Sequence, residues 1–371
     1  MSGAESPTEK AAASVMRICI DGQGLAGNLT GAGKALAGLL RQLREDYPQH
    51  EYMVLSPGSK AGWRLPQQLL WEQVQFPWLA MRRGADLLHV PGGTSAPLLH
   101  QRNLVMTVHD IAPTRHPEYL PHARSRWYWG RWVPFTARVA DRLIVPSEAT
   151  KRDLVACLRF PGDRIHVIPW GLTLDPTDPV SPAVVEQVRS RYHLPGQYLL
   201  YVGTIDRRKD YKTLLEALQR LKKGICLVVA GTLIEGRTDF PQLIERLGLA
   251  ERVRLLGYVP DEDLPVLYKE ATVFVYPSFY EGFGLPVLEA MACGTPVITY
   301  NTSSLPEVVG EAGILLDLPV SPEMLAAQIV RVMEDDALRL ELVARGIKRA
   351  ARFNWRDTAR LTIQAYEALL L

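Results

Sequence analysis

Short runs of aliphatic and β-branched residues alternate with longer segments of helical periodicity along most of the chain. In the first half the predicted strands are residues 17–21, 52–56, 86–90, 104–109, 142–146 and 165–169. Segments with apolar residues at helical spacing lie between them, and they are clearest at 31–43 and 147–158. Such an alternation is typical of a doubly wound α/β domain with a mainly parallel sheet.

The same alternation starts again after a proline-rich stretch. Residues 171–196 contain four prolines among charged residues and one short helical pattern, which indicates a connection between domains. Beyond it the predicted strands are residues 198–203, 225–231, 253–256, 273–276 and 296–300, and the chain after Pro322 is almost wholly helical. Ligands bind at the carboxyl ends of strands in open α/β sheets, so two such domains facing each other predict one shared crevice.

Length and composition agree with two globular domains and argue against some classes of function. The 371 residues are 47% hydrophobic and 22% charged, and such a length exceeds what one core usually supports. The 42 basic and 40 acidic side chains leave a net charge of +2, which argues against nucleic acid as a partner. The four cysteines are widely spaced without a C-x-x-C pair, which argues against a zinc site and disulfides and favours a reducing, cytoplasmic setting.

The amino-terminal segment and the apolar runs bear on the relation to a membrane. Residues 1–15 are polar and rich in small residues, and they predict a disordered tail rather than a signal peptide. No run of about eighteen apolar residues occurs, so a membrane-spanning helix is not expected. Peripheral contact with the inner face of the cell membrane stays open.

Arginine and aromatic residues are concentrated at 124–132, and a similar group stands at 78–83. Such residues suit a lipid interface or a polyprenyl-phosphate acceptor, which makes Arg124 and Trp127 candidate acceptor contacts. The alternative is that these are helix faces packed on the sheet.

The segment 277–296 carries the most information about chemistry. Gly282 and Gly284 allow the backbone to approach a ligand closely, and Pro286 suits the first turn of the helix that follows. The free N–H groups and the positive end of that helix would favour an anionic diphosphate.

Two glutamates flank the start of this helix. Glu281 precedes it and Glu289 falls about one turn inside, so both carboxylates face the same crevice several ångströms apart. One could bind a ribose and the other a sugar. The alternative is a pair of surface carboxylates that complement a helix N-terminus.

A basic loop follows the first strand of the second domain and opens a helix. It runs from Gly203 to Asp210 and contains Arg207, Arg208 and Lys209. Three adjacent cations could neutralise two phosphate charges. The alternative is a solvated basic turn.

The first domain offers two further candidates at strand or helix ends. Gly31 and Gly33 form a glycine-rich loop before a helix, where an anion would be favoured. His109 closes a predicted strand at the edge facing the cleft, and Asp110 could orient it or bind the acceptor. The alternative for His109 is a structural histidine.

The motif that contains both glutamates resembles that of a known family. The string E-G-F-G-L-P-V-L-E-A-M-A-C-G-T-P, which starts at Glu281, is similar to the signature of the retaining GT-B glycosyltransferases of family four, two glutamates separated by seven residues. The resemblance covers almost the whole chain after the tail. It implies an acceptor domain over 16–175, a linker over 176–195, a nucleotide-sugar donor domain over 196–352, and a final helix, about 353–371, that crosses back onto the first domain.

The resemblance also implies roles for individual residues. Glu289 would hold the donor ribose, Glu281 the donor sugar and phosphate, and Lys209 the diphosphate, while His109 would contact the sugar near the reacting carbon. The family often has an arginine five residues before the lysine, where this chain has Thr204, so Arg207 or Arg208 is expected to supply that cation. The remaining implied donor contacts are Gly31, Gly33, Gly203, Thr204, Gly231, Val259, Gly282, Phe283, Gly284 and Leu285.

The expected function is retaining transfer of a hexose, with a leaning to mannose, from a GDP- or UDP-linked sugar to a glycan or polyprenyl-linked acceptor. Lys209 would stabilise the departing diphosphate, whose own oxygen is a plausible base. The alternative is a covalent intermediate on Glu281. No D-x-D element or ligand-spaced His/Asp cluster accompanies these residues, so no metal ion or other cofactor is expected.

Three other functions stay open at the level of the sequence. A nicotinamide-dependent dehydrogenase would share the fold, but a tight G-x-G-x-x-G between strand and helix is not cleanly present. A nucleotide-sugar epimerase would also bind a nucleoside diphosphate between two domains. A non-catalytic nucleotide-sugar-binding protein would tolerate the loss of Lys209 or Glu281.

Overall fold

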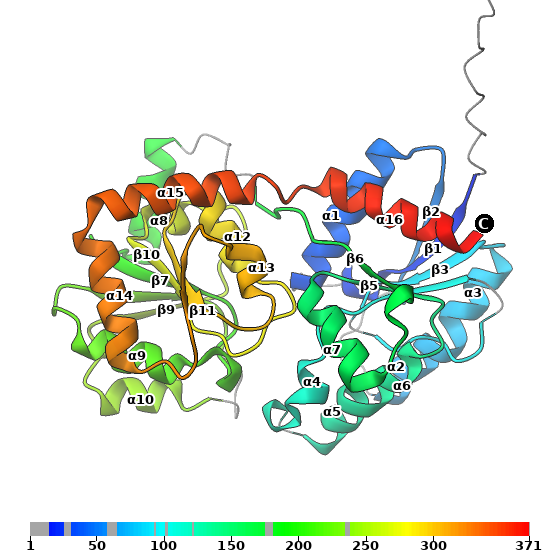
Figure 1. Ribbon diagram of the computed structural model, residues 1–371, viewed down its shortest axis with the longest axis horizontal. Coiled ribbons are helices and arrows are strands. Elements are labelled where there is room, and N and C mark those ends of the chain that lie inside the picture. The colour runs from blue at the N-terminus through cyan, green and yellow to red at the C-terminus, as the bar shows by residue number, and fades with distance from the viewer. Residues whose placement is uncertain are drawn as a thin grey trace, which may run out of the picture.

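The computed structural model describes residues 15–25, 31–57, 65–92, 94–100, 103–120, 122–174, 181–233 and 238–370. These residues form two lobes side by side, each built on a six-stranded parallel sheet (Figure 1). The prediction of two doubly wound α/β domains is confirmed. Residues 1–14 of the predicted tail lie outside the described part of the chain.

The sheet of the first lobe has the strand order β2-β1-β3-β4-β5-β6. Its strands are β1 (Arg17–Asp21), β2 (Glu51–Leu55), β3 (Leu87–Val90), β4 (Asn103–Thr107), β5 (Arg142–Val145) and β6 (Ile165–Val167). The order reverses between β1 and β3, so the carboxyl ends of these strands border a crevice.

The sheet of the second lobe has the order β12-β11-β10-β7-β8-β9. Its strands are β7 (Tyr198–Val202), β8 (Cys226–Ala230), β9 (Val253–Gly257), β10 (Val273–Tyr276), β11 (Val297–Tyr300) and β12 (Ile314–Leu316). Here the order reverses between β7 and β10. The predicted strands correspond to these elements except β12, whose three residues are too short a run to stand out as a pattern.

Helices cover both faces of each sheet. The first lobe contains α1 (Gly31–Asp46), α2 (Leu65–Leu70), α3 (Phe76–Arg82), α4 (Ala112–Arg115), α5 (Ala123–Trp127), α6 (Val133–Ala137) and α7 (Glu148–Leu158). The second contains α8 (Pro182–Tyr192), α9 (Tyr211–Arg220), α10 (Phe240–Arg246), α11 (Leu264–Glu270), α12 (Leu285–Ala292), α13 (Leu305–Val309), α14 (Pro322–Glu334) and α15 (Asp336–Ala350). The last helix is α16 (Trp355–Leu370).

Several helix starts follow from side-chain caps. Ser147 accepts a hydrogen bond from the Thr150 N–H at the start of α7, and Ser181 accepts one from Val184 at the start of α8. Helix α8 lies inside the segment 176–195 that the sequence suggested as a linker. Its Val188 is buried in the core of the second lobe, so this part of the segment packs as a structural element.

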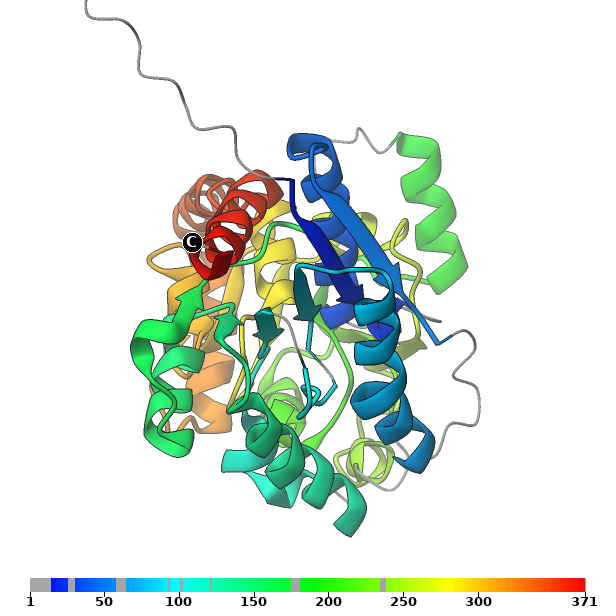
Figure 2. The same cartoon turned by 90° about the vertical axis from the view of Figure 1, so that its right-hand side faces the viewer.

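Two π-helical turns produce longer helices in the first lobe. Trp71–Gln75 joins α2 to α3, and Tyr128–Trp132 joins α5 to α6. Figure 2 shows these two helices below and beside the sheet of the first lobe. In the part of the chain that the structure describes, no helix combines the length and the apolar composition needed to cross a membrane.

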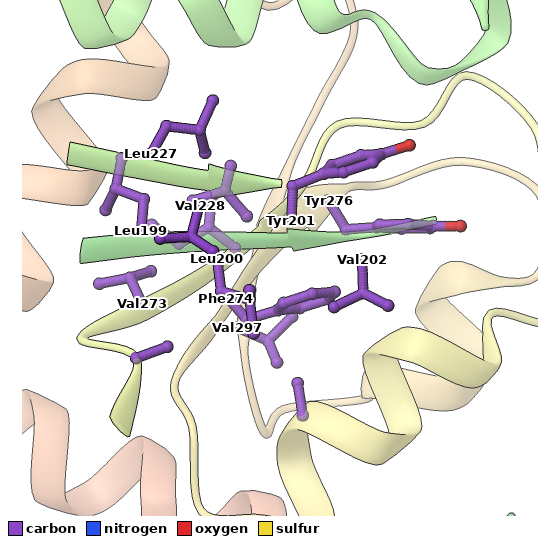
Figure 3. Close-up of a cluster of buried hydrophobic side chains, with 14 of the residues drawn as sticks. Leu199, Leu200, Tyr201, Val202, Leu227, Val228, Val273, Phe274, Tyr276 and Val297 are labelled. Atoms are coloured by element: carbon purple, nitrogen blue, oxygen red, sulfur yellow. The ribbon is translucent and has the colours of Figure 1, made fainter. Parts of the chain in front are cut away.

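The core of the second lobe is built from strands that are apolar on both faces. Leu199, Leu200, Val228 and Phe274 are fully buried (Figure 3), as is usual for strands covered by helices on both sides. At the carboxyl ends of β7 and β10, Tyr201 and Tyr276 bring hydroxyl groups into this cluster. These two hydroxyl groups point to the loops that follow the two strands.

The last helix returns to the first lobe, where it lies on α1 (Figure 1). Its first residue, Trp355, packs so tightly on Gly38 that a Cβ there would lie 2.4 Å from the indole ring. The indole nitrogen of Trp355 donates to the Leu172 carbonyl oxygen at 2.8 Å. The chain thus crosses between the lobes twice at one place, and Trp355 joins the two crossings.

We expect Trp355→Ala to lower the free energy of unfolding by about 3–5 kcal/mol, because it removes a buried indole and its hydrogen bond. Urea denaturation followed by far-ultraviolet circular dichroism measures this loss. Leu340→Ala in α15 is the control, since Leu340 is 67% exposed and should change stability little. Equal effects of the two substitutions would contradict this role for Trp355.

Candidate active site

The predicted site residues of the second lobe come from two loops at the place where the strand order of its sheet reverses, the switch point of the sheet. Lys209 lies in the loop after β7, and Glu281 lies in the loop after β10, which are neighbouring strands where the strand order reverses. In such sheets these two loops form the sides of the ligand crevice. The topology therefore explains how residues 72 positions apart meet.

The loop from β10 to α12 is fixed by hydrogen bonds from a neighbouring loop. The Glu281 N–H donates to the Ser303 hydroxyl at 2.8 Å. The Ser304 hydroxyl lies 2.9 Å from the carbonyl oxygens of both Glu281 and Phe283. Gly284 then adopts a φ of 110°, in the left-handed region that favours glycine, and α12 begins at the next residue.

Glu281 lies at the centre of a buried charge cluster. One carboxylate oxygen accepts hydrogen bonds from the Lys209 ammonium and, at 2.7 Å, from the Ser278 hydroxyl. The other oxygen is 3.5 Å from the Arg208 guanidinium. Lys209 is 5% exposed and Glu281 9% exposed, so these charges are held by each other rather than by water.

The pKa values in the cluster show that its opposite charges stabilise each other. Burial alone would raise the pKa of Glu281, but the charges of Arg208 and Lys209 hold it at about 2. Burial lowers the pKa of the Lys209 ammonium, and the Glu281 carboxylate opposes that shift. Glu281 is therefore ionised at neutral pH, with Arg208 and Lys209 as its cationic partners.

Of the two arginines that could accompany Lys209, only Arg208 joins the cluster. Its guanidinium also donates to the Tyr280 carbonyl oxygen at 2.8 Å. Arg207 is exposed. The sequence left this choice open, and the difference arises because Arg207–Lys209 is a single turn of 3₁₀ helix in which successive side chains point in different directions.

Two stacked tyrosines lie beside the cluster at the ends of neighbouring strands (Figure 3). The rings of Tyr201 and Tyr276 have centroids 5.7 Å apart. The Tyr276 hydroxyl accepts a hydrogen bond from Lys209, whereas the Tyr201 hydroxyl donates to the Thr204 carbonyl oxygen at 3.1 Å. Tyr276 and Glu281 thus both accept hydrogen bonds from the Lys209 ammonium.

Glu289 is buried in α12 and has different partners. Tyr268 donates to one of its oxygens at 2.9 Å, and the hydroxyl of Thr173 bonds to the other. Burial raises the pKa of this carboxyl, and its hydrogen bonds and the Lys34 charge oppose the shift. The two glutamates of the motif therefore sit in distinct environments, one among cations and one among hydroxyl groups.

His109 of the first lobe meets this loop directly. The Gly282 backbone lies so close that a Cβ there would be 1.9 Å from the His109 carbonyl oxygen. The imidazole packs edge-on against Trp170 with ring centroids 4.8 Å apart. Neither ring nitrogen has a hydrogen-bond partner among the described residues, and burial lowers the pKa of His109 to about 4. The ring is neutral at physiological pH.

Polar contacts also join the lobes on either side of His109. Asp110 lies 3.9 Å from the Arg208 guanidinium, and Lys34 pairs with Asp261 at 2.6 Å. The Ser147 hydroxyl donates to the Gly282 carbonyl oxygen at 2.8 Å. The facing loops are therefore in contact on both sides of the predicted reaction centre.

The predicted glycines lie around the same loops. Gly31 and Gly33 belong to the first turns of α1 rather than to a loop before it, and a Cβ on Gly31 would contact Leu285 at 3.8 Å. A Cβ on Gly231 would lie 1.9 Å from the Gly203 carbonyl oxygen. Val259 is buried just beyond β9, in the loop next to Gly231 in the sheet order.

Two candidate acceptor residues, Arg124 and Trp127, do not lie at the charge cluster around Glu281. Arg124 is exposed in α5, and Trp127 stacks on Trp132 with ring centroids 5.5 Å apart. A cavity of about 240 Å³ is bordered by His109, Asp110 and Trp129, and neither candidate residue lines it.

Sequence reasoning missed several residues that shape the site. Ser278 stands inside the informative motif, three positions before Glu281, and a search for hydroxyl groups near it would have found it. Tyr276, Thr173, Ser303 and Ser304 carry no local signal, because their roles depend on contacts across the sheet or between the lobes. Among the described residues no three His, Cys, Asp or Glu side chains are grouped as metal ligands.

Solved structures of other proteins have the same fold. A sucrose-phosphate synthase from Thermosynechococcus elongatus superposes with a TM-score of 0.76 at 24% identity over 96% of this chain and 99% of that one. Anabaena HepE in complex with UDP and glucose superposes with a TM-score of 0.75 at 21% identity over 95% of this chain and 100% of that one. The chain has the GT-B fold of glycosyltransferases.

Sequence comparison gives the family. A model described as "Glycosyltransferase Family 4" matches residues 30–175, and one described as "Glycosyl transferases group 1" matches residues 189–349. The O-antigen chain mannosyltransferase B of Escherichia coli is 40% identical over 272 residues, which are 71% of this chain and 70% of that protein. This chain belongs to the family 4, group 1 glycosyltransferases, which confirms the resemblance seen in its motif.

A second relative is longer than this chain. The serotype-specific mannosyltransferase WbdA of Escherichia coli is 29% identical over 275 residues, which are 72% of this chain but 33% of that protein. This chain is therefore similar to one part of WbdA.

We expect Gly282→Ala to separate the facing loops, because the added methyl would overlap the His109 carbonyl oxygen. Small-angle X-ray scattering should then show a larger radius of gyration, and the melting temperature should fall. Gly224→Ala is the matched control, since a Cβ there would meet no atom within 4 Å. Scattering curves that coincide for the two variants would contradict the close contact at Gly282.

Proposed function

We propose that this glycosyltransferase transfers a hexosyl group, mannosyl by preference, from a nucleoside-diphosphate sugar to a glycan acceptor with retention of anomeric configuration. The observation that carries the proposal is the cluster of Lys209, Arg208 and Glu281 at the switch point, facing His109. The preference for mannose rests on the names of the two Escherichia coli relatives. The nucleoside-diphosphate donor is supported by the HepE structures, which contain UDP or UDP-glucose.

The donor diphosphate fits between the basic loop and the start of α12. Lys209 and Arg208 offer charged donors there, and the unpaired N–H groups at the start of a helix add partial positive charge. Glu281 and Tyr276 hold the Lys209 ammonium in place. A diphosphate that enters would meet a cation already positioned, which lowers the cost of ordering it.

Retention would follow from attack of the acceptor hydroxyl on the face that the diphosphate leaves. The bond between the sugar C1 and the phosphate oxygen breaks, the acceptor oxygen bonds to C1, and its proton passes to the leaving phosphate. Lys209 and Arg208 stabilise the charge that develops on that phosphate. Glu281 is a weak nucleophile for the covalent alternative, because a carboxylate with a pKa of about 2 that already accepts hydrogen bonds from Lys209 and Ser278 is poorly basic.

His109 and Glu289 would bind the two ends of the donor. The neutral His109 ring stands beside Gly282 of the facing loop and would contact the donor sugar. Glu289 lies among the hydroxyl groups of Tyr268 and Thr173, and a ribose hydroxyl could replace or extend these bonds. The loops that carry Gly203, Gly231 and Val259 would then border the nucleoside.

We expect Lys209→Gln and Glu281→Gln each to lower kcat by about 10²–10³-fold, because each removes a group aimed at the departing diphosphate or the donor sugar. The assay measures transfer from GDP-mannose and UDP-glucose to a mannose-terminated oligosaccharide. Lys212→Gln is the matched lysine control, since Lys212 is exposed in α9 and pairs with Glu216 at 4.0 Å.

Full activity of Lys209→Gln would contradict the proposal, and nucleotide-sugar binding by a parent chain that transfers no sugar would favour a binding protein. Epimerised sugar formed without acceptor would favour the epimerase. The assay contains EDTA throughout, since transfer is expected without a metal ion. Activity that returns only with Mg²⁺ or Mn²⁺ would contradict that expectation.

A further inference from the structure

Thr173 lies where the chain first crosses from one lobe to the other. Ile168 belongs to the core of the first lobe and Leu174 to the core of the second, so the crossing is made between these two residues. Thr173 does more than continue this connection. Its hydroxyl donates a hydrogen bond to the carboxylate of Glu289, which stands 116 positions later in α12 and is the second glutamate of the E-x₇-E motif.

The backbone before Thr173 is held by the second crossing of the chain. The Leu172 N–H donates to the Phe353 carbonyl oxygen at 3.1 Å, and the Leu172 carbonyl oxygen accepts from the indole of Trp355 at 2.8 Å. Gly171 lies so close to Trp355 that a Cβ there would be 2.5 Å from its backbone nitrogen. Thr173 therefore extends from a segment whose place is set by contacts outside the donor loops.

Two hydroxyl groups from different parts of the chain hold the Glu289 carboxylate. Thr173 donates to one of its oxygens, and Tyr268 of α11 donates to the other at 2.9 Å. A carboxylate oxygen has two lone pairs, so each oxygen can accept a second hydrogen bond. The adjacent 2′- and 3′-hydroxyl groups of a ribose are a pair of donors that suits a carboxylate held in this way.

The Thr173 hydroxyl also supports the negative charge of Glu289. Glu289 is 4% exposed, and burial raises the pKa of its carboxyl. The hydrogen bond from Thr173 opposes this rise in pKa more strongly than the charge of Lys34 or the bond from Tyr268, whereas Asp261 adds to the rise. Loss of this donor would leave one oxygen of a buried carboxylate poorly solvated, which is costly.

We propose that Thr173 is a positioning residue for the donor. It sets the Glu289 carboxylate for the hydroxyl groups of the donor ribose, and it thereby ties the ribose site to the place where the chain crosses between the lobes. The inference rests on the proposed function, because it takes Glu289 as the carboxylate that binds the ribose. Thr173 acts through Glu289 and needs no contact of its own with the substrate.

The experiment is calorimetric titration of the parent chain and of Thr173→Val with GDP and UDP and with their 2′,3′-dideoxy forms. Valine keeps the branched shape of threonine and removes the hydroxyl. We expect the variant to bind the preferred nucleoside diphosphate about 5–30-fold more weakly, because a hydrogen bond to a buried carboxylate is lost. Its affinity for the dideoxy form should equal that of the parent, because this ligand offers Glu289 no ribose hydroxyl.

Two further variants serve as controls. Thr173→Ser keeps the hydroxyl and should bind both forms of the nucleotide as the parent does. Thr272→Val is the matched control, since Thr272 directly precedes β10 and so lies at the end of that strand away from the site. Thermal unfolding without ligand checks that each variant is folded, and Thr173→Ala replaces Thr173→Val if valine lowers the melting temperature.

The transfer assay gives an independent measure of the same role. Thr173→Val should raise KM for the donor and leave kcat nearly unchanged, because the ribose is held alike before and during the reaction. Loss of Lys209, in contrast, is expected to lower kcat. A fall in kcat alone would contradict a role of Thr173 in holding the ribose.

The titrations distinguish failure of this inference from failure of the proposed function. Equal losses of affinity for the ribose and dideoxy forms would overturn the inference, because they would show a general effect on the fold. Binding by Thr173→Val that matches the parent would also overturn it, and the proposed function would stand. A parent chain that binds neither GDP nor UDP would overturn both.

Discussion

Two buried charges of opposite sign, Lys209 and Glu281, constrain the site more than any other contact. Removing one of them would leave the other buried without a partner, which costs far more than the pair contributes when both are present. The loops after β7 and β10 therefore cannot move independently. Ser303 and Ser304 hold the backbone of Glu281 by hydrogen bonds, and Tyr276 accepts one from the Lys209 ammonium. The position of the cation follows from the topology of the sheet.

The second constraint is the approach of the two lobes. Gly282 allows the loop between β10 and α12 to touch the backbone of His109. The hydroxyl of Ser147, just before α7, donates to the Gly282 carbonyl oxygen. The carboxylate of Glu307 accepts hydrogen bonds from the first N–H groups of α7, at 2.8 Å from Glu148 and 2.7 Å from Ala149. A side chain of the second lobe thus caps a helix of the first, a place where negative charge is favoured.

Much of this arrangement could be predicted from the sequence. The alternation of strands and helices identified two doubly wound domains, and the E-x₇-E motif identified the family, which the comparisons confirm. These features are local, since they depend on hydrophobic period and on residues close together in the chain. The choice of Arg208 over Arg207, and the partnership of Tyr276 with Lys209, could not be predicted because they depend on side-chain direction and on contacts between strands. Likewise, Trp78 is exposed and Trp71 is buried in the same helix, and composition alone does not predict this difference.

The central claim is that the cluster around Lys209 binds the diphosphate of the donor. The most direct measurement is calorimetric titration with GDP and UDP, and with guanosine and uridine, of the parent chain and of Tyr276→Phe and Tyr201→Phe. We predict that one nucleoside diphosphate binds much more tightly than its nucleoside. Tyr276→Phe should weaken only the diphosphate, whereas Tyr201→Phe, whose hydroxyl bonds to Thr204, should bind as the parent does. Equal affinity for nucleoside and nucleoside diphosphate would contradict the account.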